Sequence, residues 1–409
     1  MGLSRLKRQV WRLTHSLVNS VGGMAAPRQT VGIDDPELPT SFSKVLSRSS
    51  WVVPAGRSVA GNLAAADAVL AAIPSELARA RYRRRLAGSV VATQEDVVVC
   101  MAGGRLAHTD GLVVTPDNRV LLGGSGVTPD SPQANNPLQL SHMPRPQAVH
   151  GTVAVLACFA TTNYYHWMTS ALPRLRLYEA AEITADAFYT PYSRSFQRES
   201  LRLMGIGPER ILAATPKRHL VADRLAVSTC QSLRISPEDC GIIHRRLTSH
   251  LPTDRATTKR LLIMRNRPGR RSILNQQELL RALKPLGFEP IYLERLPLTA
   301  QIAQFRDAAC VVGAHGAGLT NLLFCQPGTI AVEIGTPYRV LPCFAEIAHH
   351  RGLHHHLELA QPVNVRHFDP VEGVGDSDIL VEPTTIRRRL EMLLADRLAD
   401  RLADRRLAA

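Results

Sequence analysis

A glycine-rich turn that holds one histidine is the stretch of the sequence best suited to chemistry. It reads VVGAHGAGLTNLLF over residues 311–324 and joins an apolar strand-like run to an apolar helix-like run. The start of such a helix offers free backbone N–H groups to an anion, and Gly313, Gly316 and Gly318 permit close approach of the backbone. The spacing G-x-x-G-x-G is not the dinucleotide pattern G-x-G-x-x-G. The turn therefore predicts either a phosphate contact or tight strand–helix packing.

A second loop suited to anions, RNRPGRR, covers residues 265–271 and also follows a strand-like run. Arg265 and Arg267 are two of its four arginines, and a guanidinium holds phosphate oxygens with a planar fork of donors. The alternative is a solvated basic loop. Because both loops follow strands, we expect them at one edge of a sheet, where a helix dipole and a guanidinium together suit a pyrophosphate.

Two titratable residues belong to the same region. His315 lies inside the glycine turn, where it is suited to donate to a phosphate or a sugar hydroxyl, or it is a satisfied structural histidine. Glu333 lies near the end of the next strand-like run, where a carboxylate is costly unless it is bonded. It can accept two ribose hydroxyls, as acidic residues do in nucleotide-binding folds, or pair with a nearby arginine.

A third cluster lies in the first half of the chain, in TTNYYHWMTSALPRL. Asn163, Tyr165, His166 and Trp167 combine an amide, an aromatic platform and a base, which suits the binding of a sugar. Histidine is the side chain best tuned to accept a proton near neutral pH. The alternative is a helix start that buries its aromatic residues.

Two motifs resemble metal sites but lack support. HHRGLHHH, residues 349–356, has no acidic or cysteine partner at ligand spacing. Asp376 and Asp378 form a D-x-D pattern in a glycine-rich stretch that we expect far from the sheet edge. The sequence predicts no bound metal and no cofactor.

Regular elements surround the loops of the second half. Asn275 is expected to cap a helix over 276–286, with Glu278 completing a capping box and Gly287 ending the helix. Another helix is predicted over 299–308. The predicted strands are 260–264, 288–294, 310–313 and 329–335. Strands that alternate with helices indicate βαβ units and a parallel sheet, in which ligands bind at the carboxyl ends of the strands.

The rest of the chain suggests four parts. Residues 22–50 are rich in Gly, Pro, Ser and Thr and predict a linker, residues 61–87 predict helix, and short β-rich runs start near residue 96. A polar break over 250–259 is the expected boundary between two domains. The tail repeat LLADRLADRLADRRLAA predicts a solvated helix, or one that makes an oligomer contact. The expected division is 1–94, 95–250, 251–385 and 386–409.

Composition narrows the class of protein. The chain has 409 residues, 45% of them hydrophobic, which is enough to form two cores. Its formal net charge of +14 favours an anionic partner. Its seven scattered cysteines fit a reducing compartment, and no apolar run is long enough for a membrane span. Residues 1–20 combine an apolar face with arginines, so they predict contact with anionic lipid or a surface helix.

The motifs together resemble glycosyltransferase family 61. The resemblance rests on RLLIMRNRPGRR, on the G-A-H-G-A-G-L-T-N block with the downstream V-E-I, and on NYYHWMTSALPRL and FQRESLRLMGIGPERIL. It covers roughly residues 95–385. It implies an α/β fold of GT-B type, with two Rossmann-like domains facing a cleft, a nucleotide-sugar donor that is a UDP-sugar where known, and inversion without an obligate metal. It implies that the donor is held by Arg265, Arg267, Gly316, Ala317, Gly318, Asn321 and Glu333, with His166, Asn163, Tyr165 and Trp167 on the acceptor side.

The resulting hypothesis is a cytoplasmic hexosyl- or pentosyltransferase with His166, Arg265 and His315 as catalytic residues. Its acceptor would be a glycan or lipid-linked hydroxyl in surface or capsular polysaccharide synthesis, and residues 1–20 would touch the inner face of the membrane. One alternative is a basic protein that binds nucleic acid or an anionic surface without chemistry. Such binding would be steeply salt-dependent, but no nucleic-acid module is present, and the glycine spacing argues against a nicotinamide dehydrogenase.

Overall fold

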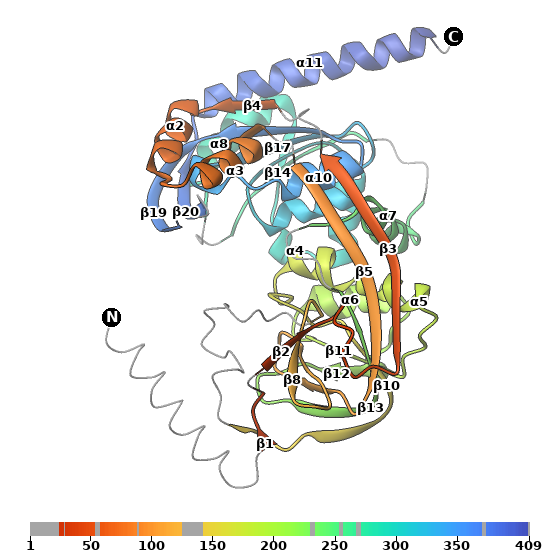
Figure 1. Ribbon diagram of the computed structural model, residues 1–409. Helices are drawn as coiled ribbons and strands as arrows, with labels where there is room; N and C mark the ends of the chain where they lie inside the picture. Colours follow the sequence, from red (N-terminus) through yellow and green to blue (C-terminus); the bar gives the residue numbers. More distant parts are fainter. Residues whose placement is uncertain are drawn as a thin grey trace. The chain divides into compact units, whose positions relative to one another are not determined.

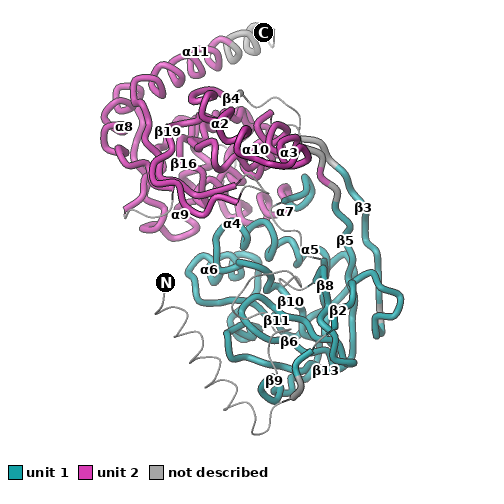
Figure 2. Tube along the Cα trace, turned by 60° about the vertical axis from the view of Figure 1, so that its left-hand side comes forward, with its two compact units in different colours: residues 1–50, 93–239 teal, residues 51–92, 240–409 magenta. Residues whose placement is uncertain are grey.

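The computed structural model divides the chain into two compact units (Figure 2). Unit 1 comprises Met1–Ser50 and Thr93–Asp239, and unit 2 comprises Trp51–Ala92 and Cys240–Ala409. The structure describes residues 24–27, 29–53, 58–87, 90–124, 142–229, 234–252, 257–266, 271–369 and 374–407. The predicted contact of residues 1–20 with a membrane and the predicted role of Arg267 lie outside the described residues.

Unit 1 is built on a mixed sheet whose centre is parallel. The strand order is β12-β11-β10-β13-β6-β7-β8-β2, and β5 pairs with β13 and with β3. The strands β10 to β13 run parallel to one another, whereas β5 and β6 are antiparallel to β13. The strands are β2 (Gln29–Gly32), β3 (Phe42–Val53), β5 (Val90–Ala102), β6 (Arg105–Ala107), β7 (Leu112–Val114), β8 (Arg119–Leu122), β10 (Gln147–Val155), β11 (Ala187–Thr190), β12 (Ile211–Ala213) and β13 (His219–Ser228), with β1 (Met24–Ala25) and β9 (His142–Met143) as a separate pair.

The helices of unit 1 connect its parallel strands. They are α4 (Tyr164–His166), the π-helix η2 (Trp167–Ala171), α5 (Arg174–Ala180), α6 (Ser195–Leu203) and the short η3 (Pro208–Arg210). From β10 the chain moves outward through β11 and β12, then returns to the other side of β10 as β13. This reversal is the topological switch point at which open α/β sheets bind ligands, and α4 follows β10 directly there.

Unit 2 contains a fully parallel sheet of six strands in the order β15-β14-β16-β17-β18-β4. Parallel sheets covered on both faces have nearly continuous apolar strands, as KRLLI and IAVEIG illustrate. The strands are β14 (Lys259–Ile263), β15 (Phe288–Ile291), β16 (Ala308–Ala314), β17 (Ile330–Gly335), β18 (His354–Leu359) and β4 (Ser58–Gly61). The predicted βαβ pattern of the second half is thereby confirmed.

Helices connect these strands, and a long helix ends the chain (Figure 1). The first turns of α11 bury Ile386 and Leu390 in the core that β14, β16 and β17 share. The helices are α2 (Leu63–Ala72), α3 (Glu76–Ala87), α7 (Pro237–Thr248), α8 (Gln276–Leu283), η4 (Lys284–Leu286), η5 (Leu293–Arg295), α9 (Leu298–Arg306), η6 (Ala317–Phe324), η7 (Pro337–Arg339), α10 (Cys343–His350) and α11 (Pro383–Leu407), beside a hairpin of β19 (Gln361–Asp369) and β20 (Val374–Leu380).

Two local predictions were wrong. Most of the long strand β3, which pairs with β5, lies in the expected linker over 22–50. Asn275 is the N-cap residue of α8, but its side chain does not cap the helix, because its amide exchanges hydrogen bonds with the backbone of Val381. The predicted helix after the glycine turn is present as the 3₁₀ helix η6. Gly287 does end its helix as predicted, in the left-handed conformation with φ 75°.

The two compact units divide the chain differently from the expected four parts. Residues 51–92 belong to unit 2 because β4 extends its sheet beside β18 and the helices α2 and α3 bury Val69 and Tyr82 against the same region. The division near the middle falls between Asp239 and Cys240, inside α7. Among the described residues, none of the helices has both the length and the apolar character needed to cross a bilayer.

Candidate functional site

The glycine turn and the arginine loop meet at the carboxyl edge of the parallel sheet in unit 2. The chain leaves β14, crosses to β15 on one side, and then returns to β16 on the other side of β14. The ends of β14 and β16 therefore flank the switch point of this sheet. Arg265 follows the end of β14, and Gly316 follows the end of β16.

The guanidinium of Arg265 lies directly over Gly316. A Cβ atom added to Gly316 would lie only 2.7 Å from Arg265 Nη2. The backbone of Arg265 is fixed by Gln276, whose side chain accepts from Arg265 N–H at 3.1 Å and donates to its carbonyl at 3.0 Å. The absence of a side chain at Gly316 thus lets the guanidinium and the start of η6 share one small space.

Three arginines surround this space, and nearby carboxylates partly balance their charge. Burial, and then the neighbouring Arg271, lower the pKa of Arg265, whereas Glu294 and Asp378 act in the opposite direction. Arg271 donates to the carbonyl of His315 at 3.2 Å and to Asp376 at 2.8 Å, and Arg339 donates to the same carboxylate at 3.2 Å. Two guanidinium groups that disfavour each other's charge are stabilised by an anion.

The other two glycines of the turn serve packing. A Cβ atom at Gly313 would lie 3.0 Å from Ile263, and one at Gly318 would lie 2.9 Å from Leu293. Asn321 is fully buried, and its amide donates to Gln301 and to the carbonyl of Gly318. These two hydrogen bonds stabilise the turn. The predicted contact of Asn321 with the donor stays a prediction.

His315 belongs to a buried chain of three residues. Glu333 receives hydrogen bonds from His315 Nδ1 at 2.5 Å and from His355 Nε2 at 2.9 Å, and all three side chains are buried. Burial lowers the pKa of His315, and the bond to Glu333 acts in the opposite direction. With Nδ1–H committed to Glu333, the ring orientation of His315 is fixed, and its Nε2 is left for chemistry.

The structure assigns partners that the sequence did not predict. Glu333 was expected to accept ribose hydroxyls, and that contact stays a prediction, since in the structure its two oxygens face histidines. His355 comes from the HHRGLHHH motif, and on β18 it pairs with Ala331, two residues before Glu333 on the same side of β17. Asp376 was expected far from the sheet edge, and this was wrong, because it binds Arg271. Among the described residues, no group of three or more His, Cys, Asp or Glu side chains is arranged to hold a metal ion.

The predicted acceptor cluster lies at the switch point of unit 1. Asn163 caps α4 by accepting from the N–H of Tyr165 at 2.9 Å, and Tyr165 is 5% exposed. Trp167 was expected to face a ligand, but it is fully buried and donates to Ser200 at 2.8 Å, because the helix start buries its aromatic residues. Tyr165 and Trp167 therefore fit the alternative interpretation, a helix start that buries its aromatic residues.

His166 differs from its neighbours. It is only partly buried, it precedes the π-helix η2, and its ring lies edge-on to Phe159, which is 40% exposed. Its Nδ1 has no hydrogen-bond partner among the described residues. Burial lowers the pKa of His166, so the ring is neutral at pH 7. π-helical turns are frequent at functional sites, and a neutral imidazole is the form that accepts a proton.

A comparison with protein families identifies the middle part of the chain. The family model Glycosyltransferase 61 matches residues 164–332, from the start of α4 to the residue before Glu333. Residues 164–332 form a glycosyltransferase family 61 domain. The predicted family is thus confirmed, and with it the class of enzyme to which this domain belongs.

Three curated relatives of the glycosyltransferase 61 domain carry related names. An EGF domain-specific O-linked N-acetylglucosamine transferase of Drosophila melanogaster is 32% identical over 27% of this chain and 22% of its own length. A xylan glycosyltransferase of Arabidopsis thaliana is 26% identical over 36% of this chain and 30% of its own length. A β-1,2-xylosyltransferase of Oryza sativa subsp. japonica is 41% identical over 14% and 10%. The chain therefore spans at most about a third of the length of these relatives.

Proposed function

We propose that the protein is an inverting glycosyltransferase of GT-B type that uses a nucleotide sugar, most simply a UDP-sugar. Unit 2 holds the donor, and the acceptor is a hydroxyl group of a glycan or of a lipid-linked saccharide in surface polysaccharide synthesis. The proposal extends to a cytoplasmic location. The observation that carries it is the position of the Arg265 guanidinium over Gly316 at the switch point of a parallel sheet. The names of the relatives support sugar transfer as the reaction.

The reaction is a single displacement at the anomeric carbon. The acceptor oxygen forms a bond to that carbon while the bond between the carbon and the diphosphate oxygen breaks, and both electrons of that bond leave with the nucleoside diphosphate. The acceptor proton passes to a base, for which His166 has the neutral ring. Its Nδ1 is buried, so the proposed accepting atom is Nε2. No metal or cofactor has a step in this scheme.

The leaving diphosphate gains charge as the bond breaks. Arg265 and the backbone N–H groups at the start of η6 stabilise this growing charge more than the charge of the ground state, which is the condition for catalysis. Arg271 adds charge nearby, and Asp376 holds it in place. His315, whose Nδ1–H is bound to Glu333, presents its Nε2 as an acceptor for a sugar hydroxyl, and only the protonated ring would donate to a phosphate.

A donor panel tests the proposal. The protein is incubated with UDP-, GDP- and CMP-sugars in the presence of simple saccharide acceptors, and release of the nucleotide is measured together with the melting temperature. We expect release from one class of donor and stabilisation by its nucleotide but not by NAD. Stabilisation by DNA alone, lost as salt rises, would instead support the basic binding protein.

A further inference from the structure

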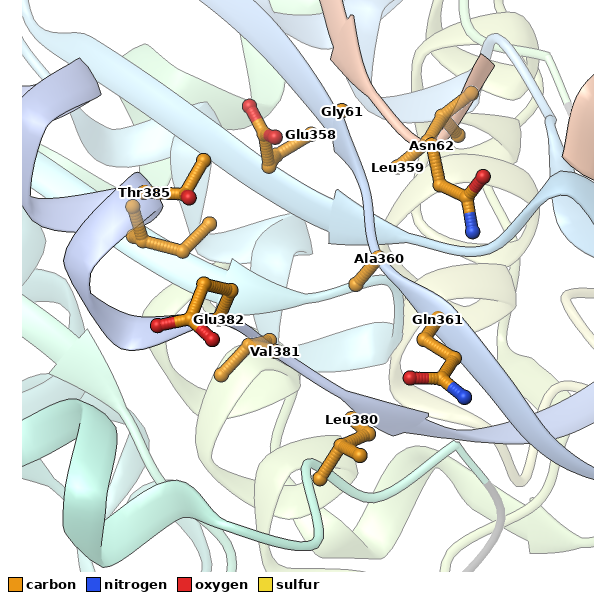
Figure 3. Close-up of a pocket in the computed structure, with 11 residues that line it drawn as sticks. Gly61, Asn62, Glu358, Leu359, Ala360, Gln361, Leu380, Val381, Glu382 and Thr385 are labelled. Atoms are coloured by element: carbon orange, nitrogen blue, oxygen red, sulfur yellow. The ribbon is translucent and has the colours of Figure 1, made fainter. Parts of the chain in front are cut away.

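A cavity of unit 2 lies away from the Arg265 site, at the carboxyl ends of β18 and β4 (Figure 3). Its volume is about 270 Å³, which is slightly below the usual range of small-molecule sites. The cavity is enclosed by these two strands, by the end of β20 and by the first turn of α11. Its lining residues are Gly61, Asn62, Glu358, Leu359, Ala360, Gln361, Leu380, Val381, Glu382, Thr385 and Ile386.

The carboxylate of Glu358 is the unusual feature of this cavity. The residue is only 5% exposed, yet within the described part of the chain no group donates a hydrogen bond to its carboxylate or forms an ion pair with it. Burial raises the pKa of Glu358, and the charge of Arg389 on α11 only partly opposes this. A buried carboxylate without partners is costly, so a ligand that donates hydrogen bonds or carries positive charge would stabilise it.

The backbone makes room for this carboxylate. Gly61 has φ +91°, and a Cβ atom there would lie 2.3 Å from the carbonyl oxygen of Leu359 and 2.6 Å from Glu358 Oε1. The chain turns at Gly61 and then starts α2, whose N-terminus is capped by Asn62 Oδ1. The amide NH₂ of Asn62 is thereby left to donate. A side chain at position 61 would fill the space that Glu358 now faces.

The other polar groups around the cavity define the chemistry of the occupant. A second carboxylate, that of the exposed Glu382, lies just before α11 and accepts from the hydroxyl of Thr384, and no lysine or arginine lines the cavity. Asn62, Gln361 and Thr385 supply amide and hydroxyl groups. The set combines two negative charges with neutral donors and acceptors, and it favours a positively charged head on a small polar body.

We propose that this cavity binds a small molecule that carries a protonated primary amine, with the ammonium group on Glu358. The site is separate from the proposed donor site, since it lies at the other side of the sheet order, beyond β17. The chain carries a net charge of +14, so a small cation gains nothing from the overall field of the protein. Saturable binding of an amine therefore requires a local acidic site such as this one.

The test uses three probes with the full-length protein at pH 7 and constant ionic strength. Putrescine represents simple diamines, glucosamine represents amino sugars, and glucose is the matched neutral control for glucosamine. Binding is followed by calorimetry and by the shift in melting temperature. We expect saturable binding of putrescine, of glucosamine or of both, and none of glucose. Binding of one amine but not the other identifies the source of the ammonium group.

Variants locate the binding. Glu358→Gln keeps the shape and removes the charge, so we expect the affinity for the amine to fall at least about 10-fold, as for a lost hydrogen bond to a charged group. Thr385→Arg places a cation at the exposed mouth and should have the same effect without touching the core. Met392→Arg adds the same charge to an exposed position further along α11 and should leave binding unchanged.

The proposal is overturned if neither amine binds, if glucose binds as well as glucosamine, or if Glu358→Gln and Thr385→Arg both bind the amine with unchanged affinity. Arg265→Ala should leave amine binding intact, so failure of the transferase proposal and failure of this one give different results.

Discussion

The two histidines at the two switch points are held in opposite ways. His315 in unit 2 is fully enclosed, and its Nδ1 is bound to a carboxylate that also binds His355. His166 in unit 1 is partly exposed, and its Nδ1 has no partner among the described residues. Burial lowers the pKa of both rings, but only His315 has a carboxylate that opposes the shift.

This difference suits the two histidine rings to different roles. A ring fixed by a carboxylate keeps one orientation, which suits the positioning of a donor that must bind in one pose. A partly exposed ring can take a proton from an incoming hydroxyl, here at Nε2 because Nδ1 is buried, and its lowered pKa keeps it neutral at working pH. We therefore assign the proton transfer to His166 and the positioning of the donor to His315.

Removing the base has the largest expected effect. His166→Ala should lower kcat by about 10²- to 10⁴-fold, the range for a lost general base, whereas His150→Ala, an exposed histidine of the same unit, should leave kcat unchanged. Since the pKa of His166 is lowered, the wild-type rate should fall only as pH drops below a value under 6.5. An unchanged rate for His166→Ala would assign the base to another residue.

Removing the guanidinium of Arg265 has the second-largest expected effect. Arg265→Ala should lower turnover by about 100-fold or more, because the growing charge of the diphosphate loses its closest cation. Arg281→Ala, which changes an exposed arginine on α8, is the matched control. Steady-state kinetics and circular dichroism together check that activity is lost while the fold remains.

Removing the carboxylate that orients His315 has a smaller expected effect, which falls mainly on KM. Glu333→Gln leaves a single carbonyl oxygen to accept from two imidazoles, so His315 loses its fixed orientation. We expect KM for the donor to rise by about 10-fold, the low end for lost outer-shell partners, with a smaller change in kcat. A fall in kcat at constant KM would instead place His315 in the chemical step.

The smallest effect on activity is expected at Trp167. Trp167→Phe removes the hydrogen bond to Ser200 but keeps an aromatic ring in the core. The free energy of unfolding should fall by about 1–3 kcal/mol, the cost of a buried group left unsatisfied, while kcat/KM changes less than about twofold. Denaturant unfolding and kinetics measure the two quantities. A large loss of kcat/KM would support the original prediction that Trp167 contacts the acceptor.

The sequence predicts the frame of unit 2 because its signals are local. Short apolar strands alternate with helices, and the loops after β14 and β16 carry Arg265 and Gly316, so the meeting of these two residues follows from strand order alone. The strand β3 was missed because its residues 43–50 are mostly exposed and polar, and its pairing with β5 joins segments about 50 residues apart.

The contacts of the site were harder to predict than its place. The bond between Glu333 and His355 depends on the register of β17 against β18, which sequence spacing does not give. Asp376 reaches Arg271 across more than 100 residues. Asn163 and Trp167 show the converse: residue types suited to a sugar are also suited to capping a helix and filling a core.

The binding of UDP and of uridine to wild-type protein and to Arg265→Ala tests the central claim most directly. The two ligands differ only in the diphosphate, so their ratio of affinities isolates the group that Arg265 and the turn at Gly316 are proposed to hold. The account predicts that wild-type protein binds UDP at least about 10-fold more tightly than uridine and that Arg265→Ala removes most of this preference. An equal preference in both proteins would contradict it.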